Sequence, residues 1–221
     1  MSDESKSMTS AFELLKKRPE IIFPFIFGLI IAGVIYTIAD VIISYIALVI
    51  LKPSGTGIYE LYILVIREIE SLFLYFFIVM AIFWQSFSSM DLVDSGDFSI
   101  RNSLSDSLSS YGAIFGIALF ISIVATLLSY IPVVGGIVDS LFTIVSLFAI
   151  MISIFNKKGF IQNIIEMPNT LTEYYKKEPT TGLFLFVLIL LFVVPNSVIE
   201  IIDLFVSVIY GSLVIKLICE N

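Results

Sequence analysis

The residues of this chain that could carry chemistry are carboxylates placed inside long apolar segments. The four strongest candidates fall in the segment halves that adjoin short turns: Asp40, Asp139, Glu200 and Asp203. An ionisable group within a membrane span is costly, so it usually faces the interior of a bundle or water. A buried carboxylate could relay protons, and a group of carboxylates could attract cations. The sequence therefore predicts a candidate polar site on the outer side of a membrane protein.

A structural explanation of the same carboxylates stays open. Asp139, Glu200 and Asp203 stand near the starts of closing helices, where the helix dipole favours a negative charge. Arg67 is placed to form an ion pair with Glu70, which would make both residues part of a solvated surface. The carboxylates have no spacing that is typical of an ion site.

The other residue types exclude several kinds of chemistry. The chain has no histidine, which excludes Ser-His-Asp and Cys-His catalysis and histidine-ligated metal sites. The single cysteine, Cys219, excludes an intrachain disulfide or a thiolate cluster. No phosphate-binding glycine loop is present. We therefore predict a non-enzymatic protein without catalytic residues, cofactors or metal ligands.

The composition indicates that helices in a membrane must position the carboxylates. Of 221 residues, 58% are hydrophobic and 14% charged, and the mean hydropathy is +1.05. Soluble domains carry about 25% charged residues. The net charge of −7 argues against nucleic acid as a partner, because binding nucleic acid requires a basic surface. We therefore predict membrane lipid as a partner and no nucleic acid.

Six apolar segments approach the roughly 20 residues that cross a bilayer as a helix. Turn-forming residues such as Pro53, Pro132 and Pro195 separate them into three hairpins, and no strand-like alternation is present. The predicted fold is an all-α, polytopic integral membrane bundle, with residues 1–20 as a cytoplasmic tail and amphipathic helix and residues 21–221 as a single membrane domain. The predicted spans are residues 21–51, 58–87, 111–131, 133–155, 180–195 and 198–218.

The basic residues predict the orientation. Ten of the twelve lysines and arginines lie on the side of the N-terminus and the longer loops, and two lie on the hairpin side. By the positive-inside rule, both termini are expected in the cytoplasm of a multi-pass protein of the cell (plasma) membrane. The residues that set this topology include Lys16, Lys17, Arg18, Lys157, Lys158, Lys176 and Lys177.

The cytoplasmic segments predict three hairpin repeats with interfacial helices. Lys-Lys-Arg-Pro at 16–19 and Lys-Lys-Glu-Pro at 176–179 each precede a hairpin, 160 residues apart. Residues 8–15, 100–108 and 161–165 carry apolar side chains at helical spacing, which is typical of helices lying in the bilayer interface or of ordinary connectors. Asp97 is placed to cap the second of these helices.

Three further features carry predictions. The first span would measure roughly 46 Å, longer than the bilayer core, so a hairpin over residues 36–70 should project outward and could contact a protein partner. Gly112 and Gly116 would let one helix pack closely on another. The polar side chains that end the second span should mark the cytoplasmic interface: Gln85, Ser86, Ser88 and Ser89.

Residues 11–24, AFELLKKRPEIIFP, carry a resemblance to a known family. This segment resembles the N-terminal entry of a group of prokaryotic, often archaeal, six-span membrane proteins of unknown function. That group is similar to the membrane domain attached to some glycerophosphodiester phosphodiesterases. The resemblance implies an all-helical membrane bundle, but no phosphodiesterase activity, because the catalytic domain and its histidines have no counterpart here.

Two functions follow as hypotheses. The first is a non-enzymatic membrane component that interacts with lipid or with a partner protein. The alternative is a small transporter or channel for protons, cations or small solutes that uses the outer carboxylates.

Overall fold

The computed structural model describes residues 6–46, 49, 56–129, 131, 135–194 and 197–220, and this part of the chain is helical without any strand. The predicted all-α fold is therefore confirmed. A 3₁₀ turn at Pro19–Ile22 joins the first two helices, and a π-helical turn at Val206–Tyr210 joins the last two. The helices are α1 (Lys6–Lys17), α2 (Phe23–Ile46), α3 (Thr56–Ser95), α4 (Ile100–Ser109), α5 (Tyr111–Ser129), α6 (Gly135–Asn156), α7 (Phe160–Lys177), α8 (Pro179–Leu191), α9 (Ser197–Phe205) and α10 (Gly211–Glu220).

Within these described residues, five helices are long and apolar enough to cross a membrane. They cover Pro19–Ile46, Glu68–Ser95, Tyr111–Leu128, Gly136–Asn156 and Val198–Glu220. The remaining predicted span corresponds to α8, which has only 13 residues. At 1.5 Å per residue α8 is about 20 Å long, shorter than the hydrocarbon core of about 30 Å. The bundle thus has five full-length apolar helices and one short one.

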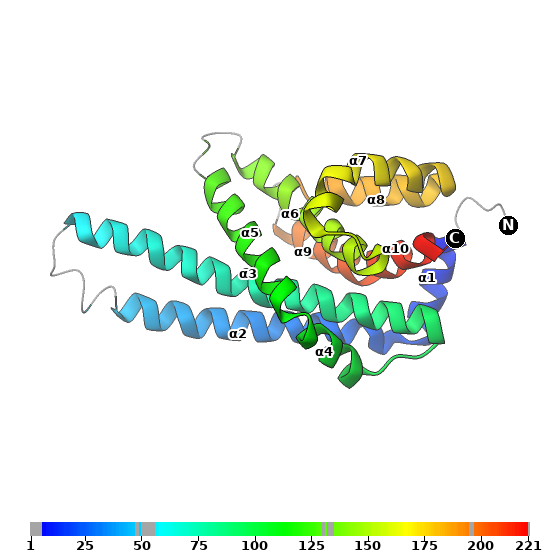
Figure 1. Ribbon diagram of the computed structural model, residues 1–221, viewed down its shortest axis with the longest axis horizontal. Helices are drawn as coiled ribbons and strands as arrows, with labels where there is room; N and C mark the ends of the chain where they lie inside the picture. The colour runs from blue at the N-terminus through cyan, green and yellow to red at the C-terminus, as the bar shows by residue number, and fades with distance from the viewer. Residues whose placement is uncertain are drawn as a thin grey trace.

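Helices α2 and α3 form a long hairpin that extends beyond the rest of the molecule, as Figure 1 shows in blue and cyan. At the opposite end, α1 packs beside α10. The described part of this hairpin thus extends past the other helices, and its projection from a membrane remains a prediction. The apolar side chains on the projecting part of α2 are exposed, including Ile38, Val41 and Tyr45.

Two glycines allow helices to approach closely. A Cβ atom built at Gly28 in α2 would overlap the Cβ of Ala81 in α3 and lie 2.9 Å from its Cα. A Cβ at Gly182 in α8 would lie 2.6 Å from the backbone nitrogen of Tyr175 in α7. A larger residue at either position would push two backbones apart, so these glycines set the distance within both helix pairs.

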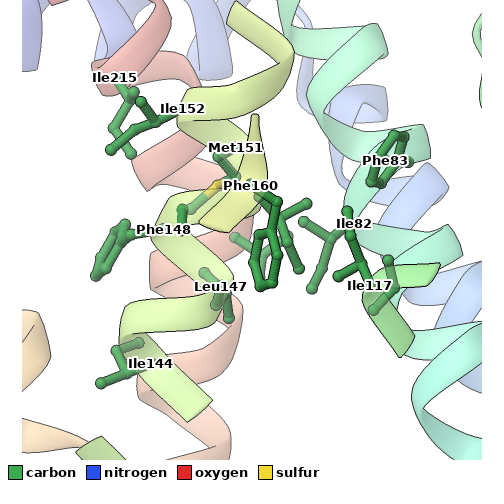
Figure 2. Close-up of a cluster of buried hydrophobic side chains, with 14 of the residues drawn as sticks. Ile82, Phe83, Ile117, Ile144, Leu147, Phe148, Met151, Ile152, Phe160 and Ile215 are labelled. Atoms are coloured by element: carbon green, nitrogen blue, oxygen red, sulfur yellow. The ribbon is translucent and has the colours of Figure 1, made fainter. Parts of the chain in front are cut away.

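The core lies where α3, α5, α6 and α10 meet. Figure 2 shows the side chain of Phe160, from the start of α7, between Leu147 of α6 on one side and Ile82 and Ile117 of α3 and α5 on the other. The Phe160 ring also contacts Phe120 edge to face, with centroids 5.9 Å apart. The first residue of α7 is thus anchored in the bundle.

The polar side chains predicted to end the second span lie inside the bundle, and the helix continues beyond them. Gln85, Ser86, Ser88 and Ser89 are all fully buried, and α3 continues to Ser95. The Oγ atoms of Ser88 and Ser103 are 2.8 Å apart, and those of Ser89 and Ser212 are also 2.8 Å apart. Hydroxyl groups on α4 and α10 replace water as partners, so this polar stretch packs inside the bundle.

The three lead-in segments form amphipathic helices, and α4 packs its serine face against the bundle. Its buried residues are Ser103 and Ser107, whereas Ile100 and Leu108 are exposed. The N-cap of α4 is Ser99, whose side chain accepts a hydrogen bond from the amide of Asn102. The cap predicted at Asp97 is therefore wrong. Exposed apolar side chains also occur on α1 (Phe12) and α7 (Ile161, Ile165).

Candidate functional site

The four predicted carboxylates occupy different surroundings. Asp40 is exposed on α2, and Glu200 is half-buried on α9. Asp139 on α6 is half-buried, with one carboxylate oxygen enclosed and without a described hydrogen-bond partner. Asp203 on α9 is buried. The described contacts join none of these four to another, and the predicted polar site remains a prediction.

Glu68 makes the best-defined carboxylate contacts on this side of the bundle. Ser122 of α5 donates a hydrogen bond of 2.7 Å to Oε1 of Glu68, and Thr126 donates to Oε2. In the sequence, the feature that could have indicated these hydrogen bonds is the spacing of Ser122 and Thr126, which places both hydroxyl groups on one face of α5.

Asp203 is the most buried of the predicted carboxylates. Its residue is 3% exposed, and in the described part of the chain neither carboxylate oxygen has a hydrogen-bond partner. It lies just before the π-helical turn, where Phe205 contacts Phe25 of α2 edge to face with centroids 5.6 Å apart. An unpaired carboxyl group in an apolar bundle is costly, so Asp203 is a candidate for function rather than for stability.

The predicted ion pair between Arg67 and Glu70 remains a prediction. The side chain of Arg67 lies outside the described residues. Glu70 is buried.

Another buried carboxylate, Glu178, lies on the side of the basic residues. It accepts hydrogen bonds from the Ser7 amide (3.0 Å to Oε2), from the Ser7 hydroxyl (2.7 Å) and from Thr181 (2.7 Å). Burial raises the pKa of Glu178, but the hydrogen bonds from Ser7 and Thr181 and the charge of Lys6 outweigh burial and lower it. Glu178 therefore fastens α1 to the start of α8, a role that sequence reasoning missed.

The described residues also line an open cavity of about 730 Å³, which we call the groove. Its wall is mostly apolar and comes from α3, α5, α6 and the start of α7. The small residues Ala113 and Gly116 leave one side open, and a Cβ atom at Gly116 would meet nothing within 4 Å. The groove is lined by Phe83, Phe87, Met90, Ser110, Ala113, Gly116, Ile117, Phe120, Ser153, Ile154, Lys157, Lys158, Gly159, Phe160, Ile161 and Gln162.

The predicted close packing at Gly112 and Gly116 does not occur between described helices. A Cβ atom at Gly112 would likewise meet nothing within 4 Å. Both glycines lie on an exposed face of α5, and only Gly116 lines the groove. They therefore form a matched pair for substitution.

The rim of the groove is basic. Lys157 and Lys158 connect α6 to α7 and are exposed. The Nζ of Lys158 lies 3.0 Å from Oε2 of Glu166, and hydrogen bonds from Gln162 and Lys158 lower the pKa of Glu166. An apolar cavity with a cationic rim fits a molecule that has an apolar chain and an anionic or polar head.

The other predicted topology residues surround the same side of the bundle. Lys16, Lys17, Lys176 and Lys177 are exposed, and Arg18 forms ion pairs with Glu20 (3.5 Å) and Asp97 (3.3 Å). Lys177 also donates to the carbonyl of Ile218 (3.3 Å). These residues lie at helix ends, as expected for side chains near lipid headgroups.

No protein-family model, curated protein or solved structure matches this chain. The resemblance of residues 11–24 therefore remains a prediction.

Proposed function

We propose that this protein is a non-enzymatic, multi-pass membrane component that binds a membrane phospholipid in the groove. The observation that carries the proposal is the combination of an apolar cavity of about 730 Å³ with two lysines at its rim. Pockets for small ligands commonly measure about 300–1,000 Å³ and are mostly apolar with a few polar groups that orient the ligand. A phospholipid is the amphiphile that surrounds such a bundle.

The exposed faces of the amphipathic helices support this proposal. Phe12 of α1, Leu108 of α4 and Ile165 of α7 direct apolar side chains away from the protein core, with Ile165 74% exposed. Helices of this kind lie in the bilayer interface with basic residues near the headgroups. In the orientation that the basic residues favour, the groove opens at the cytoplasmic interface, and the α2–α3 hairpin projects on the outer side, available to a protein partner.

The proposal predicts that Gly116→Leu removes the bound phospholipid. A leucine side chain would occupy the groove without steric overlap at its Cβ atom, because nothing lies within 4 Å of that position. We expect native mass spectrometry of the detergent-purified protein to show one retained phospholipid in the wild type and loss of most of it in Gly116→Leu.

Gly112→Leu is the matched control, since it adds the same side chain to the same helix outside the groove. It should retain the phospholipid. Equal retention by all three proteins would overturn the proposal. A stoichiometric protein that purifies in place of lipid would indicate a partner-binding component instead.

Asp203 supports transport of protons or cations as a second candidate function. Its burial and its lack of a described hydrogen-bond partner are the observations in favour. If transport is the function, Asp203→Asn is expected to reduce proton or cation uptake by reconstituted liposomes to background, because the amide has nearly the same shape but cannot carry the charge.

The control for this experiment is Asp40→Asn, which changes an exposed carboxylate on α2. Uptake that depends on Asp203 but not on Asp40 would establish transport. Absence of uptake by the wild-type protein, or equal uptake by both variants, would reject Asp203 as a transport residue.

A further inference from the structure

We infer that the groove selects an anionic phospholipid, and that Lys157 is the residue that selects it. This inference rests on the proposed function and names the class of lipid. The headgroup phosphate would lie beside Lys157 and the first turn of α7, and an acyl chain would extend along the apolar wall toward Phe120.

The two lysines at the rim are not equivalent. The charge of Lys158 is compensated by Glu166, 3.0 Å away. Lys157 forms no ion pair with any described residue, so its charge is available to a ligand. Lys157 also has a backbone φ of 58°, a left-handed conformation that side chains other than glycine, asparagine and aspartate rarely adopt. Lys157 directly follows the last residue of α6, and a left-handed residue commonly ends a helix, so this conformation turns the chain at the rim.

The start of α7 adds donors at the same place. Its N-cap residue is Gly159, so no side chain caps the first turn, and Gly159, Phe160, Ile161 and Gln162 all line the groove. The free amides and the dipole at the N-terminus of an 18-residue helix favour a phosphate group. The uncapped helix start and the unpaired lysine therefore meet at one end of the groove.

The apolar wall of the groove requires a ligand that also has an apolar chain. Phe83 and Phe87 of α3 and Phe120 of α5 line the cavity below the rim, and Gly116 opens it toward the surface of α5. A soluble phosphate or nucleotide would leave this wall against water, whereas an acyl chain would cover it. The charge of the rim and the apolar wall together commit the groove to a lipid.

Trp84 provides a direct test, because it is the only tryptophan of the chain and directly follows Phe83 in α3. The protein is reconstituted into vesicles of equimolar phosphatidylglycerol and phosphatidylcholine, with brominated acyl chains on one lipid or the other. Bromine quenches a nearby tryptophan, and the part of the quenching that Gly116→Leu removes measures lipid in the groove. We expect the wild type to prefer phosphatidylglycerol by about fivefold, the size of effect that one basic residue near a membrane produces.

Two variants remove the charge of Lys157 in different ways. Lys157→Gln keeps a long side chain, and Lys157→Gly suits the left-handed backbone, so a folding defect in the first would not affect the second. Both should bind the two lipids equally. Lys176→Gln, which removes an exposed lysine that does not line the groove, should keep the fivefold preference.

The outcomes separate this inference from the proposed function. Quenching that Gly116→Leu leaves unchanged for both lipids would reject lipid in the groove, and the inference with it. Two other outcomes would reject only the selection by Lys157, provided that Gly116→Leu lowers the quenching. In one, the wild type shows no preference for phosphatidylglycerol. In the other, the preference persists in both Lys157 variants.

Discussion

Alanine in place of Gly28 is expected to lower the free energy of unfolding by about 1–3 kcal/mol, although alanine favours helices more than glycine does. The new Cβ atom would overlap the Cβ of Ala81, and the Cα of Ala81 would lie only 2.9 Å away. Because the Cα of Ala81 is a backbone atom, it cannot move aside as a side chain can. The helices α2 and α3, the two longest of the described helices, must therefore move apart. Unfolding in mild detergent, followed by the fluorescence of Trp84, measures the change.

Two further variants make this prediction specific. Gly33→Ala introduces the same change into α2 at a position where a Cβ atom meets nothing within 4 Å, so it should be neutral or stabilise the helix by up to about 1 kcal/mol. Combining Gly28→Ala with Ala81→Gly removes the opposing Cβ and should recover part of the loss. Equal effects of alanine at residues 28 and 33 would show that α2 and α3 are not in close contact at Gly28.

Loss of the Glu178 carboxylate is expected to release α1 from the bundle. Glu178 is 5% exposed and accepts hydrogen bonds from the amide and hydroxyl of Ser7 and from Thr181. Hydrogen bonds to a charged group contribute about 1.5–3 kcal/mol each, and Glu178→Ala would leave three donors without this acceptor. Amide hydrogen exchange over residues 6–17 should accelerate by at least tenfold in Glu178→Ala. Exchange should stay unchanged in Glu173→Ala, which removes an exposed carboxylate of α7.

The same contact predicts a dependence on pH. The pKa of Glu178 in the folded protein is lower than its ordinary value of 4.5, so ionised Glu178 stabilises the docked α1. This stabilisation is complete above pH 4.5 and is lost as the pH falls through the lower pKa of the folded state. A spin label on α1 should therefore become more mobile below pH 4.5 in the wild type. In Glu178→Gln its mobility should not change over this range. A wild-type label that is equally mobile at pH 3 and pH 6 would contradict this role of Glu178.

Hydropathy predicts most of the fold because the bilayer allows few solutions. Long apolar segments must form helices, because a helix satisfies its backbone hydrogen bonds within one segment. Hydropathy did not predict the burial of polar side chains whose hydrogen-bond partners lie on other helices. Ser88 and Ser89 look like an interface in sequence, yet their partners Ser103 and Ser212 lie on helices that sequence spacing does not bring together.

The groove could be predicted only in part. Lys157 and Lys158 were predicted to lie in a loop between two helices, and they connect α6 to α7 in the structure. The apolar wall comes from four helices, so no single segment contains its pattern. Gly116 was expected to pack against another helix, since small residues on an apolar helix usually do. The structure instead leaves space beside it, and this difference distinguishes a groove from a packed interface.

Photo-crosslinking in a bilayer tests the presence of a phospholipid in the groove most directly. A phospholipid with a diazirine on one acyl chain is reconstituted with the protein, irradiated, and the labelled residues are identified by mass spectrometry. Our account predicts labelling concentrated at residues 83–90, 113–120 and 153–162, and its loss in Gly116→Leu but not in Gly112→Leu. Labelling spread evenly over the exposed faces of α2 and α5, and unchanged in Gly116→Leu, would contradict it.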